Sequence, residues 1–135
     1  MFLLDTNVVS ELRRSKCDAN VRKWIDTQLP TTLHLSVISL LELEIGVLKK
    51  ERSDRSQGLA LRKWLQLQVR PAFGNRILPI DEVVALRCAH LHVPDPKSER
   101  DALIAATADV HGMTVVTRNL KDFAASGVRL LDPWQ

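Results

Sequence analysis

The sequence predicts an α/β fold, with a mainly parallel central sheet of about five strands and helices on both faces. Short apolar segments alternate with helical patterns over the whole length, which is the order typical of a parallel sheet. The 135 residues, 45% hydrophobic and 26% charged, have the composition of one ordinary globular domain. No repeat, low-complexity tract or long linker divides them, so we expect residues 1–135 to form a single domain.

The individual elements follow from the spacing of apolar residues. Five short apolar segments are expected to be strands: residues 1–5, 33–37, 76–80, 113–117 and 128–132. Helical spacing predicts helices after Asp5 and over residues 21–29, 38–50, 59–69, 81–91 and 101–112. Residues 38–50 are apolar over most of the helix circumference, so this helix is expected to be largely buried. Gly112 is a suitable terminator for the last helix, and residues 92–100 form the clearest loop.

Charge and composition exclude several classes of function. The net charge of +3 divides into +4 over residues 1–70 and −1 over residues 71–135, which permits binding of a polyanion without requiring it. No apolar run approaches the ~20 residues that span a bilayer. The apolar start stops at Asp5 and lacks the basic segment of a secretory signal, so we expect a cytoplasmic protein with no membrane partner. Cys17 and Cys88 have no zinc-motif spacing.

Asp5 directly follows the first expected strand. Its carboxylate has two possible roles. It is either the cap of the turn and helix that follow, or part of a site, because ligands of open α/β sheets sit just outside the carboxyl ends of strands. The residue taken alone does not decide between them.

Glu42 and Glu44 both lie on the helix expected over residues 38–50. At 100° per residue, Glu42 falls beside the apolar arc of that helix and one turn before Gly46. A glycine inside a helix costs roughly 1 kcal/mol relative to alanine and usually marks close approach by another group. Glu42 is therefore well placed to face a crevice. Spacing does not exclude Glu44, and an exposed helix charge is the structural alternative.

Asp101 and Asp122 each open a helix and each have a structural alternative. Ser98 and Asp101 match an S-x-x-D capping box. Asn119 matches the cap of a short helix, and Asp122 in its first turn suits the helix dipole. The alanine-rich segment after Asp101 favours close packing on the sheet, which would hold Asp101 near the strand ends.

These acids are expected to converge on one edge of the sheet: Asp5, Glu42, Asp101 and Asp122. Carboxylates crowded into one crevice repel each other and take up protons unless a cation neutralises them. Hard oxygen ligands without a cysteine or histidine set indicate Mg²⁺, with Mn²⁺ as the alternative. Such a site activates water and holds phosphate oxygens during phosphodiester cleavage.

Four blocks of the sequence resemble the PIN domain, and most of all the VapC-type toxins of bacterial toxin–antitoxin pairs: FLLDTNVVSEL, SVISLLELEIG, RDALIAATADVHGMTVVTRNLKDF and GVRLLDPW. The resemblance spans nearly the full chain, with the blocks in the family's order. It implies a Mg²⁺-dependent endoribonuclease whose catalytic, metal-binding acids are Asp5, Glu42, Asp101 and Asp122. It prefers Glu42 to Glu44 and implies that Thr6 and Asn119 support the site. It also implies a homodimer and an antitoxin whose tail occupies the active-site groove.

The side chains expected to contact RNA phosphates are Arg13, Arg14, Lys49, Lys50, Arg118 and Lys121. With no tyrosine, three phenylalanines and three tryptophans, base stacking is not expected to be the main grip on RNA. Two other functions stay open. One is a housekeeping nuclease that processes RNA or acts on DNA. The other is a non-catalytic module that binds nucleic acid or a protein partner, against which the acids argue, because a binder of polyanions gains nothing from an acidic pocket.

Overall fold

The computed structural model describes residues 1–135 and contains one five-stranded sheet. Its strands are β1 (Phe2–Leu4), β2 (Leu33–Ser36), β3 (Ile77–Leu78), β4 (Thr114–Val116) and β5 (Leu130–Leu131). All strand pairs are parallel, in the order β3-β2-β1-β4-β5. The chain therefore builds outward from β1 in one direction and then returns to its other side, so the strand order reverses between β1 and β4. The predicted parallel sheet is confirmed, with every strand shorter than its expected segment.

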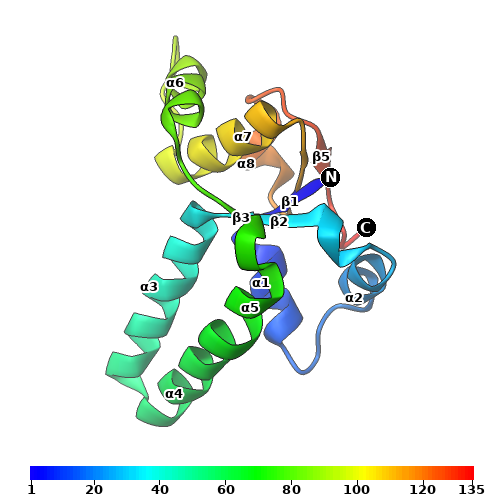
Figure 1. Ribbon diagram of the computed structural model, residues 1–135, viewed down its shortest axis with the longest axis vertical. Helices are drawn as coiled ribbons and strands as arrows, with labels where there is room; N and C mark the ends of the chain where they lie inside the picture. The colour runs from blue at the N-terminus through cyan, green and yellow to red at the C-terminus, as the bar shows by residue number, and fades with distance from the viewer.

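Helices cover both faces of the sheet, as predicted (Figure 1). The first group comprises α1 (Thr6–Arg13), α2 (Ala19–Asp26), α3 (Val37–Ser53), α4 (Arg55–Trp64) and α5 (Arg70–Phe73). The second comprises α6 (Glu82–Leu91), α7 (Glu99–His111) and α8 (Leu120–Ala124). Single 3-10 turns, Pro30–Thr32 and Gly74–Arg76, precede β2 and β3. None of the helices combines the length and apolarity needed to cross a membrane.

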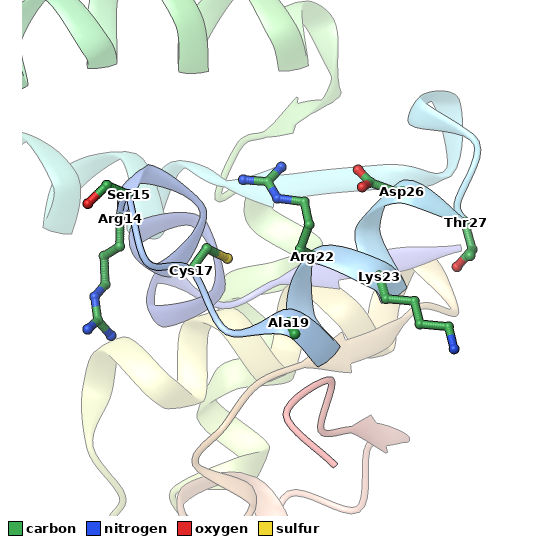
Figure 2. A pocket seen from close by; sticks show the side chains of 8 residues that line it. All are labelled: Arg14, Ser15, Cys17, Ala19, Arg22, Lys23, Asp26 and Thr27. Carbon is green, nitrogen blue, oxygen red and sulfur yellow. The ribbon is translucent and has the colours of Figure 1, made fainter.

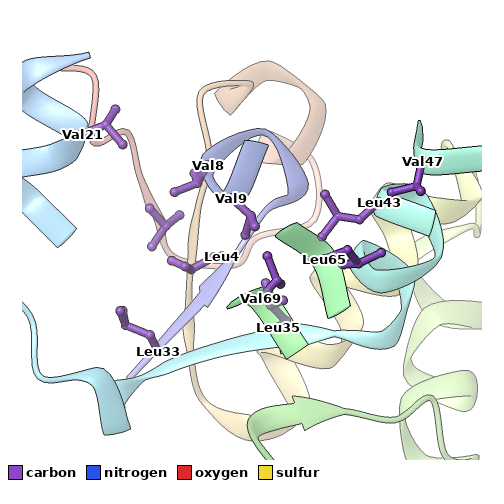
Figure 3. Packing of buried hydrophobic residues seen from close by; sticks show 11 residues of the cluster. Leu4, Val8, Val9, Val21, Leu33, Leu35, Leu43, Val47, Leu65 and Val69 are labelled. Carbon is purple, nitrogen blue, oxygen red and sulfur yellow. The ribbon is translucent and has the colours of Figure 1, made fainter. Parts of the chain in front are cut away.

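A separate apolar core fills each face, because neighbouring residues of a strand point in opposite directions. In β1, Leu4 packs in the core shared with α1, α2 and α3, whereas Leu3 packs with α7 and α8. Val116 and Val115 divide β4 between the same two cores. Figure 3 shows the larger core, in which side chains from β1 and β2 meet those of the surrounding helices. Covering on both sides explains why β1, β3 and β5 are apolar throughout and why β2 and β4 are mostly so.

Three expectations about helices were wrong. Leu29 lies beyond the end of α2 and is exposed, because a residue before proline is biased away from helical backbone. The helix expected over residues 59–69 begins at Arg55, and its second half is a π-helical segment, Leu65–Val69. The helix α3 is not largely buried: Leu41 and Leu48 are 46% and 51% exposed, since α3 and α4 project together away from the sheet (Figure 1).

Candidate active site at the carboxyl edge of the sheet

Asp5 lies at the end of β1, where the strand order reverses. Its buried carboxylate accepts hydrogen bonds from the Thr6 N–H at 2.8 Å, the Thr117 hydroxyl at 2.8 Å and the Asn7 amide at 3.3 Å. The first bond makes Asp5 the N-cap of α1, as its structural alternative predicted. The capping role does not explain the bond from Thr117, which joins Asp5 to the end of β4, the strand on the other side of the reversal. A crevice at such a reversal is where open α/β sheets bind ligands.

The two glutamates of α3 have different surroundings. Glu42 accepts a hydrogen bond from the Thr6 hydroxyl at 2.7 Å, directly beside Asp5. Glu44 receives two hydrogen bonds from the Arg62 guanidinium of α4, at 2.7 and 2.6 Å. These bonds hold the pKa of Glu44 below its ordinary value. The structure therefore places Glu42 at the edge of the sheet and Glu44 in a helix–helix contact.

Asp101 lies in the first turn of α7 and is half-buried. The predicted capping box was wrong, because the Ser98 side chain makes no capping hydrogen bond to α7. Burial, reinforced by the negative charges of Asp5, Asp122 and Glu42, raises the pKa of Asp101 to about 6. Asp101 is thus held against other carboxylates, and its side-chain hydrogen bond with Ser98, which lowers the pKa, offsets their effect only in part.

Asp122 and Asn119 border the site from its exposed side. Asp122 lies in the first turn of α8, as expected, and its charge raises the pKa of both Asp5 and Asp101. Asn119 occupies the N-cap position of α8, but its side chain makes no capping bond, so the predicted side-chain cap was wrong. Its backbone N–H instead donates to the Thr117 hydroxyl at 3.0 Å.

The carboxylates of this edge are only weakly neutralised within the chain. Burial raises the pKa of Asp5, against the hydrogen bonds from Thr117 and Thr6. The single ion pair to these acids is long, with 3.7 Å between Arg100 Nη1 and Glu42 Oε2. No three Asp, Glu, His or Cys side chains converge closely enough to hold one ion among them. Mg²⁺ takes only one or two carboxylates directly and keeps several waters, so it does not require three converging acids.

Two hollows meet at Glu42. The larger, of about 680 Å³, lies between α3 and α7 and includes Asp101 and Arg100 in its lining. The smaller, of about 200 Å³, lies between α1, α3 and α4 and includes Thr6 and Gly46. An extended ligand that crosses Glu42 therefore has space on either side of this residue.

Two of the cations predicted to contact phosphate lie near these hollows or strand ends. Arg13 lines the smaller hollow, with its guanidinium carbon 5.9 Å from the centre of the Trp64 ring. Arg118 directly follows Thr117, and its guanidinium carbon lies 5.2 Å from the centre of the Trp134 ring. Both arginines are exposed and are held by an aromatic side chain rather than by an acid.

Of the other four predicted cations, one lies far from Asp5 and three form no ion pair. Arg14 lies beyond the far end of α1 from Asp5, where it pairs with the buried Glu11 at 3.1 Å. It lines a third hollow, of about 590 Å³, together with Arg22 and Lys23 of α2 (Figure 2). That hollow contains none of the four acids. The remaining three cations form no ion pair: Lys49, Lys50 and Lys121.

Sequence reasoning missed three side chains that contact the acids. Thr117 is fully buried, and its hydroxyl contacts Asp5 and Asn119. Its signal was a polar residue at the end of an otherwise apolar strand. Asn7 donates to Asp5 and follows it by two residues. Arg100 had no signal in the sequence beyond its position next to Asp101.

A family model described as PIN domain matches residues 2–126. The chain belongs to the PIN domain family. This PIN domain is 37% identical over 140 residues to the VapC ribonuclease Y4jK of Sinorhizobium fredii, a match that covers 100% of this chain and 99% of the relative. It is similar to the crystal structure of FitAcB from Neisseria gonorrhoeae, with 35% identity, a TM-score of 0.92 and coverage of 100% and 99%. It is also similar to a toxin–antitoxin complex from Klebsiella pneumoniae, with 27% identity, a TM-score of 0.69 and 98% of each chain covered.

Proposed function

We propose that this PIN domain is a Mg²⁺-dependent endoribonuclease and the toxin of a toxin–antitoxin pair, cleaving RNA phosphodiester bonds with metal-activated water. The observation that carries the proposal is the weakly neutralised acid edge, where Asp5 and Asp101 have raised pKa values and lie at the reversal of the sheet. A relative named a VapC ribonuclease and a similar toxin–antitoxin complex support it independently.

The residues proposed to hold the metal are Asp5, Glu42, Asp101 and Asp122. Bound Mg²⁺ would supply Lewis-acid chemistry, lowering the pKa of water and neutralising phosphate oxygens. The chain's own contribution is to orient these acids: Thr117 and the Thr6 N–H fix the Asp5 carboxylate, and the Thr6 hydroxyl fixes Glu42. Such outer contacts are needed because a ligand that rotates freely loses metal affinity.

Cleavage of single-stranded RNA by the purified protein tests the proposed activity. We expect cutting with Mg²⁺ or Mn²⁺ and loss of cutting in excess EDTA. Equal cutting with chelator present would contradict the metal-dependent mechanism. The Asp5→Asn protein serves as the control for a contaminating nuclease, because it should be inactive when prepared in the same way.

The toxin role requires an antitoxin, whose tail we propose to occupy the groove over the acids. An acidic pocket with Arg100 and Arg13 in the linings of its two hollows suits a basic or amphipathic peptide. Expression of this protein alone should arrest growth, and co-expression with the adjacent small open reading frame should restore growth and give a co-purifying complex. Growth without arrest and no complex would favour the housekeeping nuclease. Sequencing of RNA ends after brief induction would identify the cleaved RNA.

We also propose that the protein is a homodimer. Val83 and Leu86, on the outer side of α6, are 60% and 62% exposed, and such neighbouring apolar side chains favour a covered surface. Light scattering of the purified protein should give twice the chain mass of 15.2 kDa. A monomer mass at all concentrations tested would refute the dimer without affecting the nuclease proposal.

A further inference from the structure

Gly46 is a glycine that the fold itself does not require. It lies in the interior of the seventeen-residue helix α3, where glycine is less favourable than alanine. A Cβ atom built on Gly46 meets no atom within 4 Å, and its backbone φ is not positive. Gly58 of α4 is the contrast, because a Cβ there would lie 2.5 Å from the Glu51 Cα. Packing accounts for Gly58 and leaves Gly46 without an explanation inside the chain.

The bare surface of Gly46 is one wall of the smaller hollow, which we call the Gly46 cleft. Helix α1 contributes polar side chains to it, helix α3 the glycine, and helix α4 an aromatic ring. Its lining is Thr6, Ser10, Arg13, Glu42, Leu43, Gly46, Val47, Leu61 and Trp64. At about 200 Å³ it is smaller than the roughly 300 Å³ at which pockets for drug-sized ligands begin, so its occupant is a single ring or side chain.

The chemistry of the lining suits a flat, polar-edged ring attached to an anion. The Trp64 ring and the Arg13 guanidinium above it are both surfaces on which bases stack. Ser10 and Thr6 supply hydroxyl groups at the edge of the cleft. Arg13, which has no acidic partner, is free to neutralise a phosphate.

The position of the cleft favours RNA as its occupant. Glu42 belongs both to the cleft and to the proposed metal site, so an occupant of the cleft must be able to lie directly beside whatever binds over the acids. A nucleotide meets that condition, since its phosphate lies over the acids while its base turns aside.

We propose that the Gly46 cleft is a substrate subsite, which accepts the base of a nucleotide next to the scissile phosphate of single-stranded RNA. Gly46 provides the space, Trp64 and Arg13 the stacking surfaces, and Arg13 also a phosphate contact. The inference rests on the proposed nuclease function and adds a residue that selects the substrate.

Substitution of Gly46 separates this role from a structural one. In Gly46→Ala the added Cβ meets nothing within 4 Å, so the melting temperature should stay equal to that of the wild type or rise, whereas Gly46→Leu carries more bulk into the cleft. Gly46→Ala should weaken RNA binding about tenfold, the lower end of the effect of one methylene in a pocket, and Gly46→Leu should weaken it more. Ser53→Ala and Ser53→Leu make matched changes at the exposed end of the same helix and should leave binding unchanged.

Binding is measured by fluorescence anisotropy with a labelled random-sequence pool of single-stranded RNA and Mg²⁺, using Asp5→Asn as the common background to prevent cutting. In the otherwise wild-type protein, the same Gly46 substitutions should raise the KM for RNA. The wild type should bind the four RNA homopolymers with different affinities. These differences should be smaller in Gly46→Ala, because a base rather than the backbone fills the cleft.

Unchanged RNA binding and KM in Gly46→Leu would overturn the subsite. Unchanged RNA binding together with loss of the antitoxin complex would also overturn it, by assigning the cleft to a protein side chain. These results are distinct from failure of the nuclease proposal, which shows as a wild-type protein that binds RNA without cutting it. A wild-type protein that neither binds nor cuts RNA would remove both proposals.

Discussion

Two acidic regions meet on helix α3, and they differ in how their charge is balanced. Toward α4, Glu44 and Glu51 share the guanidinium of Arg62, with distances of 2.6 Å and 3.0 Å. Toward the sheet, Glu42 lies with Asp5 and the neighbouring acids, and its contact with Arg100 is 3.7 Å long.

The pKa values follow this difference. Hydrogen bonds from Arg62 hold the pKa of Glu44 below its ordinary value, so its charge is stabilised by the fold. The pKa values of Asp5 and Asp101 are raised, mainly by burial and further by the nearby carboxylates. The acids toward α4 carry their own counterion, whereas the acids at the sheet edge have only the long contact with Arg100.

The largest expected effect comes from Asp5→Asn. Asparagine caps a helix about as well as aspartate, so the metal-free protein should be as stable as the wild type or more stable. RNA cleavage should fall about 100-fold or more, since even outer contacts of metal ligands are worth 10- to 100-fold. The wild type should gain about 2.7 kcal/mol of stability at an Mg²⁺ concentration 100 times the dissociation constant, and the variant should lose this gain.

Thermal melts and cleavage assays with and without Mg²⁺ measure all three effects. An Asp5→Asn protein that cuts RNA and keeps the metal-induced rise in melting temperature would show that Asp5 acts only as a helix cap.

The second effect compares the two regions directly, through Glu42→Gln and Glu44→Gln. Glu42→Gln should remove most of the cleavage, because it takes a charge from the acid edge. Glu44→Gln should leave most of the cleavage and slightly lower the melting temperature, because it breaks the pair with Arg62. The two substitutions lie two residues apart on one helix, so each is the control for the other. The opposite ranking of activities would show that the metal site was assigned to the wrong side of α3.

A smaller effect is expected from Thr117→Val. This change keeps the shape of the side chain but removes the hydroxyl that donates to Asp5 and accepts from the Asn119 N–H. Cleavage should fall about tenfold, and the free energy of unfolding should fall by about 1–3 kcal/mol. Thr107→Val is the matched control, because the Thr107 hydroxyl is also buried but bonds only the Leu103 carbonyl in its own helix. Equal cleavage by the two variants would deny Thr117 a role in orienting Asp5.

The smallest effect is a pH dependence of the metal-free protein. Between the ordinary pKa of 3.8 and about 6, the folded state holds a proton on Asp101 that the unfolded state has released. The contribution of this proton to the free energy of unfolding is therefore present at low pH and is lost as the pH rises through that window. The stability of Asp101→Asn relative to the wild type should rise from pH 4 to pH 6, as followed by denaturant unfolding without metal. A difference that is constant over this range would mean that Asp101 titrates normally.

Much of the fold was predictable because its signals are local. Short apolar segments identified all five strands, and Gly112, with φ of +66°, ends α7 as its position predicted. The errors concern features that spacing does not reveal, such as the π-helical segment over Leu65–Val69 and the exposed side of α3. A helical pattern reports which residues share a face, but not whether another element covers that face.

The sequence by itself determined the elements and the short list of acids that follow strand ends or open helices. Only the tertiary structure decided which acids share a crevice, since that depends on contacts between residues distant in the chain. The bond from Thr117 to Asp5 exists because β4 pairs beside β1 in register, and Glu44 leaves the site because α4 brings Arg62 against it. Local periodicity encodes the backbone of each segment, whereas the balance of charge at a site is set by the neighbours that packing supplies.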